Sequence, residues 1–187
     1  MSEDAPSAAP SAARAAARTD PRAAGAPATA RPRLVLVGIG NELRGDDGVG
    51  LELARRVARR ADPRVLAVRE HAGETLGLIE ELAPFGAAVL IDALRSGGVP
   101  GSSQRLDLSR DAVPRELRRS TSTHAIGVGE AVELARALEL LPARVVLYAV
   151  EGERFDAGSP LSDAVHAALP GLTEALLREL RTLALAP

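Results

Sequence analysis

A glycine-rich segment with two adjacent acids constrains this chain more than any other part of its sequence. It reads Gly-Ile-Gly-Asn-Glu-Leu-Arg-Gly-Asp-Asp-Gly-Val-Gly from Gly38 to Gly50, and it follows the apolar run Leu34-Val-Leu-Val37. Such a run is typical of a strand buried on both faces, and glycines permit a tight turn after it. Because apolar residues then recur at helical spacing over residues 49–60, the segment is predicted to link a strand to a helix.

The two acids, Asp46 and Asp47, fall at the start of that helix. An acid there can serve the helix as a cap or through its dipole, and for Asp46 this structural role explains the residue as well as function does. Asp47 is the better functional candidate, because open α/β sheets bind ligands beyond the carboxyl ends of their strands. A dinucleotide site is the competing interpretation, but Leu43 stands where the third glycine of G-x-G-x-x-G belongs, and two carboxylates would repel a pyrophosphate.

Two further residues are expected at the same place. Asp92 follows the apolar run from Ala87 to Ile91, so its carboxylate should emerge at the carboxyl edge of the sheet. His124 lies in a short polar turn before a helical pattern that starts at Val128. Two carboxylates and one imidazole suit a first-row divalent metal, although an aspartate at a strand end or a histidine before a helix also arises from local hydrogen bonding. His71 and His166 are weaker candidates.

The order of the remaining patterns predicts an α/β fold of three αβα layers around a mostly parallel, twisted sheet of about five strands. Predicted strands cover residues 34–37, 65–68, 87–91, 104–108 and 145–150, and predicted helices cover 49–60, 75–82, 128–140 and 162–183. Residues 1–32, rich in Ala, Pro, Ser and Arg, are predicted to be a disordered tail, and residues 33–187 a single domain. The glycine-rich stretch Arg95–Gly101 is expected to be a mobile loop beside Asp92.

Composition excludes several functions. The chain has no cysteine, so disulfides, thiolate ligands and a cysteine nucleophile are ruled out. A net charge of −2, with two Phe, one Tyr and no Trp, gives little basis for binding nucleic acid. No apolar run is long enough for a membrane span or a signal peptide, so a cytoplasmic location is expected. No G-x-S-x-G motif supports a serine hydrolase, and nothing in the sequence demands more than a monomer.

Three segments together resemble the hydrogenase maturation endopeptidases. These are the Gly38–Gly50 segment, the apolar run Ala87-Ala-Val-Leu-Ile-Asp-Ala93, and the turn Ser122-Thr-His-Ala-Ile-Gly127, which occur in the order that the family shows. The resemblance implies an enzyme that removes the C-terminal extension of a [NiFe] hydrogenase large-subunit precursor after nickel insertion. The chain departs from the family pattern at His71-Ala-Gly-Glu-Thr75, where many members have a sequence similar to D-G-G-T.

Carried over to this chain, the resemblance assigns catalytic and metal-binding roles to Asp47, Asp92 and His124. It implies nickel that arrives with the precursor, while the residues alone leave another divalent metal open. Three mechanisms remain open: recognition of nickel in the precursor, hydrolysis by a metal that the chain holds itself, and a carboxylate pair that activates water. Two other functions are alternatives, namely a metal-sensing assembly chaperone that does not cleave and a nucleotide-binding oxidoreductase.

Overall fold

The computed structural model describes residues 33–109, 111, 113 and 127–185 of the 187-residue chain. The predicted tail over residues 1–32 and the predicted ligand His124 lie outside the described residues.

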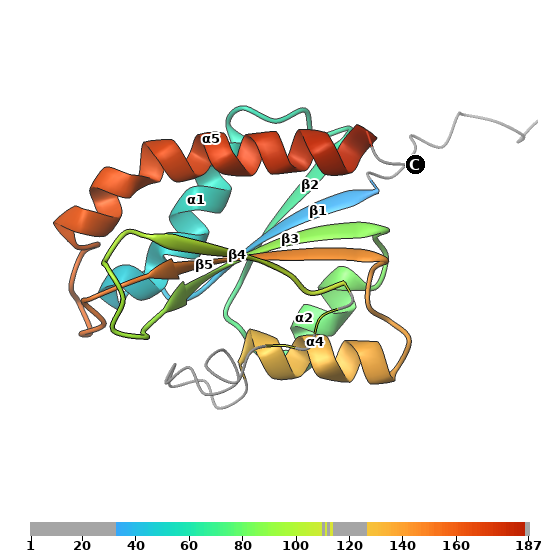
Figure 1. Ribbon diagram of the computed structural model, residues 1–187, viewed down its shortest axis with the longest axis horizontal. Coiled ribbons are helices and arrows are strands. Elements are labelled where there is room, and N and C mark those ends of the chain that lie inside the picture. The colour runs from blue at the N-terminus through green and yellow to red at the C-terminus, as the bar shows by residue number, and fades with distance from the viewer. Residues whose placement is uncertain (1–32, 110, 112, 114–126, 186–187) are drawn as a thin grey trace, which may run out of the picture.

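A five-stranded sheet forms the centre of the molecule (Figure 1). The strands lie in the order β2-β1-β3-β5-β4, and only β4 runs antiparallel to its neighbour. Their bounds are β1 Leu34–Ile39, β2 Leu66–His71, β3 Ala87–Leu94, β4 Ser103–Asp107 and β5 Arg144–Glu151. Every residue of β1 is buried, as expected for a parallel strand covered on both faces.

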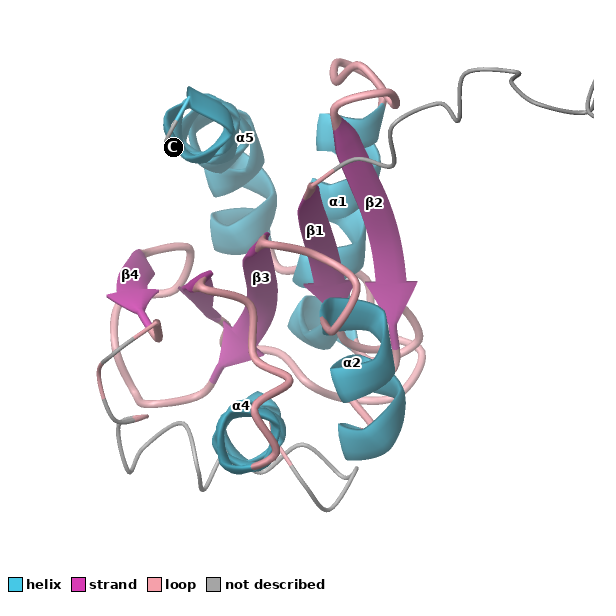
Figure 2. Cartoon of the chain, turned by 90° about the vertical axis from the view of Figure 1, so that its right-hand side faces the viewer, coloured by secondary structure: helices cyan, strands magenta, loops and turns pink. Residues whose placement is uncertain are grey.

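Helices cover both faces of this sheet (Figures 1 and 2). Helices α1 and α5 pack on one face, and α2 and α4 pack on the other. Their bounds are α1 Val49–Ala58, α2 Thr75–Leu82, α4 Val128–Ala137 and α5 Asp163–Leu185, and a 3-10 turn, η1, covers Gly45–Gly48 before α1. The predicted three-layer fold with a mostly parallel sheet is therefore confirmed.

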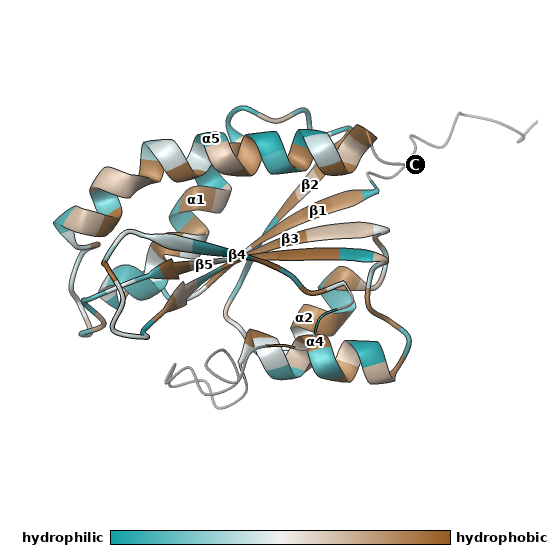
Figure 3. Cartoon of the chain, in the orientation of Figure 1, coloured by the Kyte–Doolittle hydropathy of each residue, from teal (hydrophilic) through white to brown (hydrophobic). Residues whose placement is uncertain are grey.

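The core consists of two apolar layers, one on each side of the sheet. Leu36 and Leu53 lie in the layer beneath α1 and α5, and Leu78 and Leu90 lie in the layer beneath α2 and α4. Figure 3 shows the same division, with apolar strands at the centre and polar residues on the outer helix faces. Within the described part of the chain, no helix is both long and apolar enough to cross a membrane.

The observed elements differ from the predicted ones mainly at their ends. The most important difference concerns β3, which was expected to stop at Ile91 but continues to Leu94, so that Asp92 lies inside the strand and not after it. The extra residues pair with β5, where Asp92 lies opposite Ala149. This pairing sets the direction of the Asp92 side chain.

Candidate active site

The site lies where the sheet changes its winding direction. Successive connections place β2 on one side of β1 and β3 on the other, and ligands of open α/β sheets bind at the carboxyl edge beside such a point. Asp47, in η1 after β1, and Asp92, near the end of β3, both lie there, and η1 contacts β3 directly. The structure therefore brings together the two acids that the sequence analysis selected.

Asp92 points to the face of the sheet that α2 and α4 cover. Leu90 and Leu94 belong to the apolar layer on that face, and side chains at every second position of a strand share a face. Helix α4, which follows His124 in the sequence, packs on this face, but His124 itself is not among the described residues.

Burial and the charge of Asp47 together control the ionisation of Asp92. Burial of the Asp92 carboxyl is the larger effect and the negative charge of Asp47 the second, and they raise the pKa of Asp92 from 3.8 to about 7. A hydrogen bond from the Ala93 N–H to Asp92 Oδ1, at 2.9 Å, opposes them only in part. Because burial and the charge of Asp47 both disfavour an ionised Asp92, a proton on Asp92 or a cation beside it is favoured.

The glycines of the Gly38–Gly50 segment allow close packing around Asp47. A Cβ on Gly40 would lie 1.7 Å from the Asp47 carbonyl oxygen, and Gly40 also has a φ of +140°. A Cβ on Gly38 would lie 2.2 Å from the Gly50 carbonyl oxygen. Gly38 therefore has a packing role, since its φ is not in the positive range, whereas Gly40 needs both the space and the conformation.

The backbone of this segment is unsuited to binding phosphate. Its N–H groups already donate to carbonyl oxygens: that of Asn41 donates to Asp47 at 3.2 Å, and that of Asp46 donates to Arg154 at 2.7 Å. A dinucleotide-binding turn needs such groups free for the pyrophosphate. The oxidoreductase alternative therefore lacks its binding element.

Asp46 has a structural role. It is fully buried, and its carboxylate accepts hydrogen bonds at 2.7–2.9 Å from the backbone N–H groups of Glu153, Arg154 and Ser162. Burial favours a higher pKa, but these hydrogen bonds outweigh it and lower the pKa of Asp46. The residue fixes the connection between β5 and α5 against η1, so its role is to hold this loop and not to cap η1, whose N-cap is Arg44.

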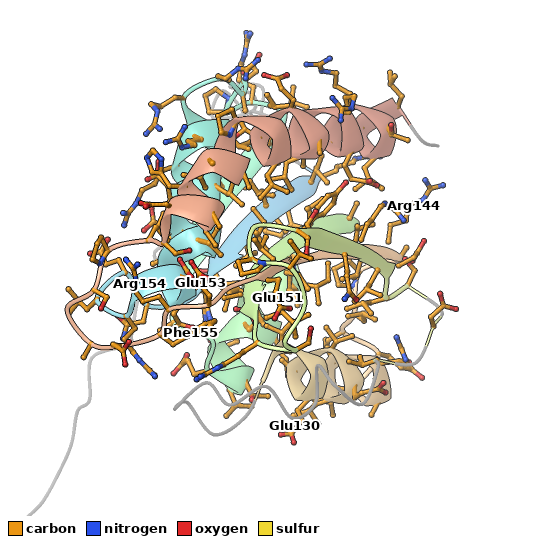
Figure 4. All side chains as sticks on the ribbon, turned by 60° about the vertical axis from the view of Figure 1, so that its left-hand side comes forward. Glu130, Arg144, Glu151, Glu153, Arg154 and Phe155 are labelled. Atoms are coloured by element: carbon orange, nitrogen blue, oxygen red, sulfur yellow. The ribbon has the colours of Figure 1, made fainter. Side chains whose placement is uncertain are left out.

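Glu151 holds a second loop at the same edge and was not singled out by the sequence analysis. It ends β5 and is only 3% exposed, and Figure 4 shows it close to Glu153, Arg154 and Phe155. Its carboxylate accepts hydrogen bonds at 2.7–3.1 Å from the backbone N–H groups of residues 96–98 and from the Ser96 hydroxyl. An acid at the end of an apolar strand is the signal that identified Asp92, and the same signal could have identified Glu151.

This anchoring contradicts the expected mobility of the Arg95–Gly101 loop. Besides the contacts with the Glu151 carboxylate, the Gly101 N–H donates to the Glu151 carbonyl oxygen at 2.8 Å. The Arg95 guanidinium also lies 5.6 Å from the centre of the Phe155 ring, within the range of a cation–π contact. The loop is therefore fixed at several points along its length.

The two remaining histidines differ in position. His71 ends β2 at the same sheet edge, and its Nδ1 accepts a hydrogen bond from the Gly73 N–H at 2.9 Å. His166 is exposed on α5, as expected for a surface residue. Within the described residues, no three His, Cys, Asp or Glu side chains are grouped closely enough to hold a metal, so a three-ligand site depends on His124.

Comparisons with known proteins agree with this architecture. The sequence profile of the hydrogenase maturation protease family, HycI, matches residues 49–179. The hydrogenase expression/formation protein HupD of Rhodobacter capsulatus is 28% identical over 158 residues, which cover 83% of this chain and 74% of that protein. HupD of Bradyrhizobium diazoefficiens is 31% identical over 137 residues, which cover 71% of this chain and 70% of that protein.

Solved structures show the same fold. The hydrogenase-maturating endopeptidase HybD of E. coli has a TM-score of 0.70 at 23% identity, over 80% of this chain and 93% of its own. The [NiFe] hydrogenase maturation protease HybD of Thermococcus kodakarensis has a TM-score of 0.62 at 26% identity, over 79% and 99% respectively. The profile match covers more than half of the chain and includes Asp92 at the sheet edge. The chain therefore belongs to the hydrogenase maturation protease family, whose members are endopeptidases.

Proposed function

We propose that this protein removes a C-terminal extension from the large-subunit precursor of a [NiFe] hydrogenase, and that it acts on the precursor once nickel is in place. The observation that carries the proposal is the pairing of Asp47 and Asp92 at the switch point of a fold whose family consists of hydrogenase maturation proteases. Nickel is part of the substrate in this proposal. A cytoplasmic location and a monomeric state stay predictions from the sequence.

The donor set is suited to a divalent metal. A cation beside Asp47 and Asp92 would relieve the repulsion that helps to raise the pKa of Asp92 to about 7. Carboxylate oxygen and imidazole nitrogen are both suitable ligands for nickel, and the proposed third ligand is His124. The role of His124 rests on the motif Ser122–Gly127 alone, since that turn is not described.

The chain's own residues would handle the proton in peptide hydrolysis. A carboxyl group whose pKa is about 7 exchanges its proton near neutral pH, which is what a general base for water requires. Burial, and after it the charge of Asp47, keep the pKa of Asp92 in that range, so the two acids have different roles. In the metal-dependent mechanism Asp47 and Asp92 would instead hold the metal, and the metal would supply Lewis acidity for the scissile carbonyl.

The test is incubation of the purified protein with nickel-loaded and nickel-free precursor, followed by mass spectrometry of the products. Release of a C-terminal peptide from the nickel-loaded form alone supports nickel recognition. Equal release from both forms, even with a chelator present, would instead support a carboxylate pair that needs no metal. A stable complex without any released peptide would support the assembly chaperone and refute the protease.

Asp92→Asn is expected to fold and to lower the cleavage rate by at least about 100-fold, the usual contribution of a general base. Glu130→Gln is the matched control, because Glu130 is an exposed acid on α4 whose side chain points away from the sheet (Figure 4). If Asp92→Asn cleaved the precursor at the wild-type rate, Asp92 would have no place in the mechanism.

A further inference from the structure

A groove of about 710 Å³ runs between β2 and α2, and we call it the β2 groove. One wall is a face of β2, with Ala67, Arg69 and His71, and the other wall comes from α2 and the residue before it, with Glu74, Glu80 and Glu81. Because β2 is an edge strand, α2 covers this face incompletely (Figure 2). The groove therefore lies beside the sheet and is open to solvent.

The groove leads to the candidate active site. One end of the groove is His71, the last residue of β2, which pairs in register with Ile39 of β1. The residue before Ile39, Gly38, pairs with Ile91, the residue before Asp92. His71 and Asp92 thus stand two strands apart at the same level, which is roughly 10 Å at a strand spacing of about 4.8 Å. The backbone at this end is joined to the active-site loop, since the Gly40 N–H donates to the His71 carbonyl oxygen at 3.1 Å.

The groove carries a surplus of negative charge. Arg69 lies 3.3 Å from Glu81 and offsets one of its three glutamates. Glu74 is 73% exposed at its side chain. Among the described residues, its one ion-pair partner is His71, at 3.8 Å, and Glu80 forms no ion pair. Two carboxylates are left to attract a cationic ligand, and Phe85 and Ala67 add apolar surface for the stems of long side chains.

The ligand would lie along the groove and not extend the sheet. The Arg69 guanidinium donates to the Val68 carbonyl oxygen at 3.0 Å. The His71 carbonyl faces β1, and backbone groups alternate in direction along a strand, so the Val68 carbonyl faces the outer edge. Arg69 therefore blocks strand addition at this point, as charged residues on edge strands commonly do.

We propose that the β2 groove binds an extended, positively charged stretch of the hydrogenase precursor close to the bond that is cut. This rests on the proposed function, and it adds a feature by which the substrate is chosen. An extended chain advances about 3.3 Å per residue, so the roughly 10 Å from Asp92 to His71 takes three residues. The four further residues of β2 down to Ala67 place the basic residues about three to seven positions from the scissile bond.

The test is a charge reversal in the groove, Glu74→Lys with Glu80→Lys, assayed for cleavage of the nickel-loaded precursor. The expected result is a rise of about tenfold in KM with kcat unchanged, because exposed charge pairs contribute little each. At high salt the rise in KM should be smaller, because salt screens these charges. The matched control is Glu130→Lys with Glu139→Lys, which makes the same change of charge at two exposed acids that form no ion pair among the described residues, one on α4 and one just after it. Its KM should stay within about twofold of the wild type. A groove variant with the KM of this control would overturn the proposal.

A second arm changes the substrate. Replacing basic residues of the precursor by glutamate three to seven positions from the cut should weaken cleavage by the wild type and restore part of the rate of the groove variant. An unchanged KM for these precursors would also overturn the proposal. Failure of the proposed function looks different, because then the wild-type protein itself releases no peptide from any precursor.

Discussion

Replacing Asp92 by asparagine is expected to stabilise the folded protein, and to do so more strongly as the pH rises. The cause is the pKa of Asp92, which burial and the charge of Asp47 raise from 3.8 to about 7. Between these values the folded protein holds a proton that the unfolded chain has lost. The contribution of Asp92 to stability is therefore fully present below pH 3.8 and is lost as the pH rises through 7. Asparagine keeps the size of the side chain and an oxygen for the Ala93 N–H, but it never ionises.

The size of the effect follows from the same two pKa values. A difference of about three units at 1.36 kcal/mol per unit makes the ionised carboxylate costly by about 4 kcal/mol at high pH. Part of this cost is already present at pH 5, because the unfolded chain is then largely ionised. Between pH 5 and pH 8 the cost should grow by about 2 to 3 kcal/mol. The advantage of Asp92→Asn over the wild type in the free energy of unfolding should grow by the same amount.

Urea unfolding followed by circular dichroism, from pH 5 to pH 8 and with a chelator present, measures this difference. Glu130→Gln is the control, since Glu130 is exposed and its variant should follow the wild type at every pH. A stability difference between Asp92→Asn and the wild type that stays constant with pH, or shrinks as the pH rises, would refute the electrostatic account of the acid pair.

Three further substitutions test the packing around the site. Gly40→Ala should destabilise the fold by at least about 3 kcal/mol and abolish cleavage, because the new Cβ meets the Asp47 carbonyl oxygen; a thermal melt like that of the wild type would contradict this. Asp46→Ala leaves three backbone N–H donors without their acceptor and should cost about 3 kcal/mol in urea unfolding, and a loss below about 1 kcal/mol would show that the loop has other anchors. Glu151→Ala removes the acceptor of three N–H groups and should speed hydrogen exchange at residues 96–98 by at least about tenfold while β1 is unaffected, and unchanged exchange there would rule out the anchoring role.

Much of this fold could be predicted from local patterns in the sequence. The run Leu34–Val37 has no polar residue, which is typical of a strand covered on both faces, and β1 is such a strand. Helix α2 was predicted with the bounds that it has, Thr75–Leu82, since its apolar periodicity and the residues at its ends agree. These features depend on neighbours along the chain, so the chain order alone is enough to predict them.

The candidate site could be predicted in part. Asp47 and Asp92 were selected because each comes at or near the end of an apolar strand, and parallel strands bring such ends to one edge. The sequence could not separate the role of Asp46 from that of Asp47, although they are neighbours. Only the folded chain brings the N–H groups of Glu153, Arg154 and Ser162 onto Asp46, from more than a hundred residues away.

The sequence by itself determined the layered fold, the family and the two acids of the site, because each depends on residue type and local order. Only the tertiary structure decided the pKa of Asp92, the anchoring of the Arg95–Gly101 loop by Glu151 and the charge of the β2 groove. The physical reason is that electrostatic energy and hydrogen bonding depend on distances through space, and these distances join segments that are remote along the chain.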